Sequence, residues 1–95
     1  MNHIETQIVK VIIEDILAAG HSISVLGEGE LDLAPSTDPA AILDVIGISD
    51  ETTLLVGNLG GILLVHGNDG DVIADYHVML APLLIRAEAL AERFQ

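Results

Sequence analysis

The N-terminal segment places the strongest constraint on the fold. Isoleucine recurs at every fourth position and further aliphatic residues flank that row: Ile4, Ile8, Ile12, Ile16, Val9, Ile13 and Leu17. At about 100° per residue, this apolar surface covers roughly two-thirds of a helix, more than packing on one sheet face requires. Asn2 and Glu5 form an imperfect capping box, and Gly20 suits a left-handed end. We predict a helix that is covered from a second side, by another element or another subunit.

Two more helices are predicted. Pro39 at a first helical position, with Asp38 or Ser36 as the cap, indicates a short helix over residues 39–46 that ends at Gly47. An amphipathic pattern predicts a last helix from about residue 80 to 94, with Pro82 in its first turn.

The strands are short and rich in β-branched residues. Alternation or apolar runs predict strands over residues 22–26, 52–56, 62–66 and 71–77, and an extra edge strand around Leu31 and Leu33. The runs at 54–56 and 62–65 are apolar on both faces, so we expect cover on both sides or by a partner. The order α-β-α-β-β-β-α indicates an α+β fold, an antiparallel meander sheet packed by helices, in a single domain over residues 1–95.

The stretch HGNDGDVIADYH at residues 66–77 combines histidines and aspartates, as metal sites do. Asp69-Gly70 between two apolar runs nevertheless predicts a two-residue type I′ hairpin turn, in which 66 faces 73, 64 faces 75 and 62 faces 77. That register separates His66 from His77, and the spacing does not suit a calcium loop. We expect a turn, with adventitious cation binding at 68–71 left open. Asp75 either caps the turn into the last helix or projects from the exposed face.

No catalytic motif is evident. The glycine-rich stretches GEGE (27–30) and GNLGG (57–61) do not open a helix after a strand, so turns are expected there rather than phosphate-binding loops. No histidine pair has metal-ligand spacing, and no serine has a nucleophile-elbow context. We predict no enzyme activity, no cofactor and no metal.

Charge is the unusual feature of the composition. Fifteen acids face three basic residues, for a net charge of −12, and no Lys or Arg occurs between Lys10 and Arg86. Local ion pairs cannot neutralise the twelve acids of that window. The resulting field repels nucleic acid and anionic lipid and attracts basic proteins, although solubility alone is a simpler explanation. The absence of cysteine and of a signal-peptide pattern predicts a cytoplasmic location.

The segment GGILLVHGNDGDVIADYHVMLAPLL, with STDPAAIL and DETTLLV upstream, resembles small uncharacterised proteins of phages, prophages and other bacterial mobile elements. In that group a strand, a Gly-Asn-Asp-Gly turn and a second strand precede a Leu-rich helix. The resemblance covers about residues 36–84. It implies a genomic setting and a fold, and no established activity.

Two functions follow from these observations. The first is an interaction module, a DNA mimic or anti-CRISPR-type inhibitor, whose acids occupy a basic surface of a nucleic-acid-handling complex without binding nucleic acid or membrane. The acids expected to bind this partner are Glu28, Glu30, Asp32, Asp38, Asp50, Glu51, Asp69 and Asp71. The second is a structural domain that forms a homodimer through the apolar first helix or the strand faces, with charge serving solubility.

Overall fold

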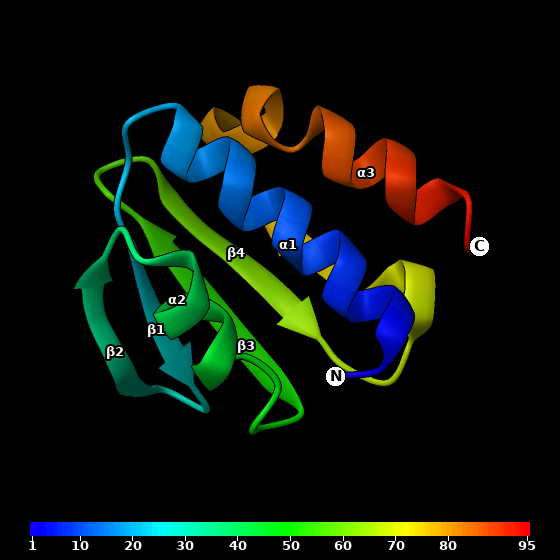
Figure 1. Cartoon of the computed structure of the whole chain (residues 1–95), viewed down its shortest axis with the longest axis horizontal. Coiled ribbons are helices and arrows are strands. Elements are labelled where there is room, and N and C mark those ends of the chain that lie inside the picture. The colour runs from blue at the N-terminus through cyan, green and yellow to red at the C-terminus, as the bar shows by residue number, and fades with distance from the viewer.

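Five strands form one antiparallel sheet, and the helices cover only one of its faces (Figure 1). The computed structural model describes residues 1–95. The strand order β2-β1-β3-β4-β5 makes β2 and β5 the edges. The elements, with η for a 3-10 helix, are α1 (His3–Ala18), β1 (Ile23–Gly27), β2 (Glu30–Ser36), α2 (Pro39–Val45), β3 (Glu51–Val56), β4 (Gly60–Val65), η1 (Asp69–Asp71), β5 (Ile73–Tyr76), η2 (Val78–Leu83) and α3 (Ile85–Glu92). The predicted α+β class and antiparallel sheet are confirmed, and the extra edge strand is β2.

The helix ends follow local sequence signals. The Asn2 side chain accepts the Glu5 N–H at 2.9 Å and so caps α1. The Asp38 side chain accepts the Ala40 N–H at 3.0 Å, which confirms it as the cap of α2. After α2, Gly47 has a φ of +87°, a conformation that costs glycine little because it has no Cβ.

The excess apolar surface of α1 is covered within the same chain. One face of α1 packs on the sheet, while α2 and α3 contact it from either side (Figure 1). Ile8, Ile12 and Ile16 are consequently 0% exposed. Of the two predicted covers, another element is the one observed, so α1 has no need of a second subunit.

The sheet has one buried and one open face. Alternate residues of the three central strands lie fully buried under the helices, namely Ile23, Val25, Leu54, Val56, Ile62 and Leu64. The intervening residues face away from the helices. They are half-buried or, like Leu55, exposed. The helices of this chain cover only one face of these strands, so the expectation that the chain itself covers both faces is wrong. Any second cover must come from outside it.

The hairpin between β4 and β5 differs from the predicted type I′ turn. Residue 62 pairs with Tyr76 and residue 64 with Ile73, with an irregularity between these pairs, and a 3-10 turn connects the strands. Asp69 takes the positive φ of 50°, whereas Gly70 packs against the C-terminal end of α3, where an added Cβ would lie 2.6 Å from the Ala91 carbonyl oxygen. The predicted register was wrong because contacts with α1 and α3, distant in sequence, determine this connection.

The last helix is also interrupted, contrary to the prediction of one helix over 80–94. A 3-10 segment, η2, precedes α3, and Leu84 separates them. Pro82 has no N–H and its ring would collide with the carbonyl four residues earlier in an α-helix. The bonds observed here are instead of the 3-10 type, from Leu80 N to His77 O at 2.9 Å and from Leu84 N to Ala81 O at 3.2 Å.

Candidate functional site: an acidic row at one end of the sheet

Strand pairing brings five of the eight predicted acids to one end of the sheet. Gly27 pairs with Thr52, so the turn between β1 and β2 lies beside the start of β3. That turn and the adjoining residues carry Glu28, Glu30, Asp32, Asp50 and Glu51, all of which are exposed. Asp32 extends back over Gly27, where an added Cβ would collide with its carboxylate. Acids from two separate parts of the sequence therefore lie at the same end of the sheet.

Asp69 and Asp71 continue this row on the far side of β3. The N–H of His66, the residue after β4, donates to the Asp50 carbonyl at 2.9 Å, and η1 follows three residues later. We call these seven acids the acidic row: Glu28, Glu30, Asp32, Asp50, Glu51, Asp69 and Asp71.

Asp38 does not belong to the acidic row. It follows β2 at the opposite end of the sheet, since Ser36 pairs with Ile23 at the start of β1. Its side chain serves the helix cap described above. Seven of the eight predicted acids are therefore brought together along one end, and the eighth has a local structural role.

The three basic residues lie on or beside the helices. Lys10 is on α1, Arg86 is on α3 and Arg93 follows α3 directly, so no strand carries a Lys or Arg. Arg93 belongs to the segment that packs on Gly70, between Asp69 and Asp71. Arg86 is paired with Asp15 of α1 and approaches Glu14 at 4.0 Å, away from the acidic row. The row therefore has no ion pair with a Lys or Arg, and its field projects into solvent.

The buried carboxylate of Glu5 holds the backbone of the segment that carries Asp69, a member of the acidic row. The Glu5 side chain is 1% exposed, and its Oε2 accepts the N–H of Gly67 at 2.8 Å and of Asp69 at 3.0 Å. Charge-assisted bonds of this kind are about twice as strong as neutral ones. Glu5 thereby ties the segment between β4 and η1 to the first turn of α1.

Sequence reasoning treated Glu5 only as part of a capping box and missed this role. The signal was present, because Glu5 precedes Val9 by four residues and Ile12 by seven, on the buried side of α1. An acid in an apolar stripe requires a partner, although only the fold identifies that partner as the backbone of residues 67 and 69.

His66 and Thr52 complete the buried cluster. His66 Nε2 lies 2.9 Å from Thr52 Oγ1, which in turn accepts the Gly47 N–H at 3.4 Å. The Thr52 hydroxyl has one proton and two acceptor lone pairs, so it can donate to Nε2 or accept from it. Nδ1 lies 3.6 Å from Glu5 Oε1, and neither atom has another partner.

Burial lowers the pKa of His66 below 6.5, mainly because the buried ring is poorly solvated when charged; the N-terminal amine acts in the same direction, while Glu5 and Asp50 oppose it. The unfolded chain therefore binds this proton more readily than the folded chain. We expect stability to be fully retained above pH 6.5 and to fall as the pH drops from 6.5 toward the folded pKa.

Urea unfolding at about pH 7.5 and about pH 5.5 measures this dependence. His66→Gln is expected to show a smaller loss on acidification than the wild type. The control His3→Gln, at an exposed position of α1, should lose as much as the wild type. Equal losses in all three proteins would contradict the assignment to His66.

The order Thr52, His66, Glu5 resembles a hydrolytic triad, but the cluster is closed to substrate. Thr52 is only 2% exposed, and none of the three residues lines a surface hollow. A nucleophile must reach the reacting atom of its substrate. The cluster is suited to holding structure rather than to catalysis.

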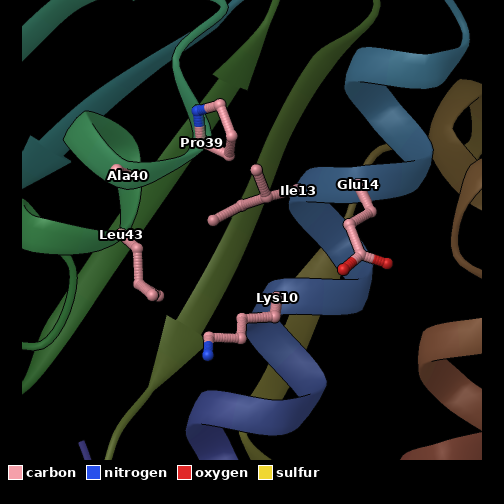
Figure 2. Close-up of a pocket in the computed structure, with 6 residues that line it drawn as sticks. All are labelled: Lys10, Ile13, Glu14, Pro39, Ala40 and Leu43. Carbon is pink, nitrogen blue, oxygen red and sulfur yellow. The ribbon is translucent and has the colours of Figure 1, made fainter.

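A hollow of about 400 Å³ lies between α1 and α2 (Figure 2). Ile13 points toward α2 and faces Pro39 and Leu43, whereas Lys10 and Glu14 extend in different directions from α1 (Figure 2). Its polar groups do not converge on a common point. This geometry offers apolar contact and no acid–base pair.

No group of three or more His, Asp or Glu side chains is arranged to hold a metal ion. None of the helices has the length and apolar character that crossing a membrane demands. Comparisons with protein-family models, with curated proteins and with solved structures find no match to this chain.

Proposed function

We propose that this chain is a non-enzymatic binding protein whose acidic row docks on a basic surface of a partner protein. The observation that carries the proposal is the gathering of seven predicted acids along one end of a sheet whose strands contain no Lys or Arg. Clustered charge of one sign steers a partner of opposite sign and speeds its association.

The partner surface we favour is one that ordinarily holds nucleic-acid phosphates, because such surfaces present clustered Lys and Arg. The chain would then act as a DNA mimic or anti-CRISPR-type inhibitor in the cytoplasm. The buried position of the Thr52–His66–Glu5 cluster supports binding over catalysis.

The test measures binding of a fluorescent decalysine peptide at increasing salt. The triple variant Glu28→Gln, Asp50→Asn, Glu51→Gln removes three charges from the acidic row. Its control, Glu14→Gln, Asp38→Asn, Asp44→Asn, removes three charges from exposed positions on α1, at the cap of α2 and on α2, and keeps the same net charge. Exposed charge pairs are each worth about 0.2–1 kcal/mol, so the row variant should bind roughly ten-fold more weakly than the control at low salt.

The difference between the two variants should shrink as salt rises, because exposed charges separated by more than the Debye length of about 8 Å at physiological ionic strength are largely screened. Equal weakening in both would mean that only net charge matters, which would remove the acidic row as a site. An affinity that does not change with salt concentration would contradict the electrostatic proposal.

Self-association is the second candidate function, and the open sheet face favours it. The apolar surface of α1 is already covered by the chain itself, so a homodimer would have to use the strands. Sedimentation equilibrium at micromolar concentration decides this candidate. A monomer across the range would exclude a stable homodimer.

A further inference from the structure

The open face of the sheet carries an uncovered apolar surface. Leu26 pairs with both Leu31 and Thr53, and Thr53 pairs with Leu63, so these side chains form a row across four strands. Leu31 is 60% exposed and Leu55, one row away, is 37% exposed. Exposed apolar side chains that lie together on one face are a feature of interaction sites.

A hollow of about 540 Å³ lies on the same face, lined by residues that include Thr53, Gly61, Leu63, Asp75, His77 and Val78. Gly61 has no side chain, so the space beside Leu55 and Thr53 stays unfilled and the hollow is open there. Val78, at the rim, is 75% exposed. The hollow offers room for an apolar side chain of a partner.

The charges around this face are all acidic. Glu51 alternates with Thr53 and Leu55 and so shares their face, at the point where the acidic row begins. Asp75 pairs with Leu63 on the opposite margin; it is exposed, and its Oδ1 accepts the Tyr76 N–H at 2.8 Å rather than capping the next helix.

Charge complementarity identifies the occupant. A second copy packed face to face would bring the same acids together with no Lys or Arg, since the strands carry none. Like charges brought together at an interface oppose association. A partner that brings its own cations would neutralise Glu51 and Asp75 while covering the leucines.

We propose that the open face docks an apolar segment of the same basic partner, with lysine or arginine on both sides of that segment. This inference rests on the proposed function and extends it, because it adds an apolar anchor to the acidic row. The apolar contact supplies affinity that salt does not screen.

The test uses two synthetic nonapeptides with three lysines at each end and either Leu-Ile-Leu or Ser-Ser-Ser in the centre. Their affinities for the full chain are compared by fluorescence anisotropy. The wild type should bind the apolar-centred peptide about ten-fold more tightly, because only its leucine and isoleucine side chains are stabilised by leaving water at the open face.

The open-face variant Leu55→Ser, Val78→Ser should lose this preference. Its control, Ile85→Ser, Phe94→Ser, alters two apolar residues of matched exposure, 68% and 37% against 75% and 37%, at the first position of α3 and just after its end. The control should keep the preference. Circular dichroism verifies folding, and Leu31→Ser provides a second open-face variant should the double variant unfold.

The row variant Glu28→Gln, Asp50→Asn, Glu51→Gln should weaken both peptides equally. If both peptides bind with equal affinity and strong salt dependence, the open-face anchor is wrong and the proposed function stands. If neither peptide binds, both proposals fail. A wild-type dimer that the open-face variant dissociates would identify a second copy as the occupant and overturn the proposal.

Discussion

Replacement of Glu5 by alanine is expected to lower the free energy of unfolding by about 3 kcal/mol, because it removes the charged acceptor that two backbone donors share. The Gly67 and Asp69 N–H groups both donate to Oε2 of Glu5, a residue that is only 1% exposed. Urea unfolding at neutral pH measures the loss.

Two further variants separate this effect from helix propensity and from charge. Glu14→Ala changes an exposed acid of the same helix and should alter stability by less than about 0.5 kcal/mol. Glu5→Gln keeps an oxygen that can accept the two N–H groups, and should fall between wild type and Glu5→Ala. A Glu5→Ala protein as stable as Glu14→Ala would show that the buried bonds contribute little.

Ile12→Ala is expected to cost about 2–5 kcal/mol, the usual range for truncating a fully buried aliphatic side chain. Ile12 is 0% exposed, on the buried side of a helix enclosed by the sheet, α2 and α3. The cavity left by three missing carbons cannot close without moving several packed elements.

Ile85→Ala is the matched control, because Ile85 is 68% exposed and the same atoms are removed. It should change stability by less than about 0.5 kcal/mol. The loss in Ile12→Ala should also be independent of protein concentration, since the cover of α1 is intramolecular. A loss that grows on dilution would instead indicate that a second subunit covers this helix.

The Glu5 bonds connect stability to the candidate site. Glu5 lies on the first turn of α1, and it determines the conformation of the loop that presents Asp69. An ordered loop loses less conformational entropy when it binds, so the buried carboxylate helps to preorganise one end of the acidic row. The position of the acidic row thus depends on both the sheet and α1.

The sequence by itself determined the elements whose signals are local. Capping by Asn2 and Asp38, the termination of helices at Gly20 and Gly47, and the two-residue alternation of the strands depend on residues within about one helical turn or one strand. Such signals act before any tertiary contact forms, which is why the fold class and the edge position of β2 were predicted correctly.

Only the tertiary structure decided the features that depend on residues far apart in the chain. The register of β5 and the 3-10 turn at Asp69 follow from contacts with Glu5 and with the end of α3. The gathering of seven acids depends on strand order, which alternation does not specify. The periodicity of the sequence determines whether each residue faces inward or outward. Which strands pair with one another, and in which register, depends on the packing of the whole core.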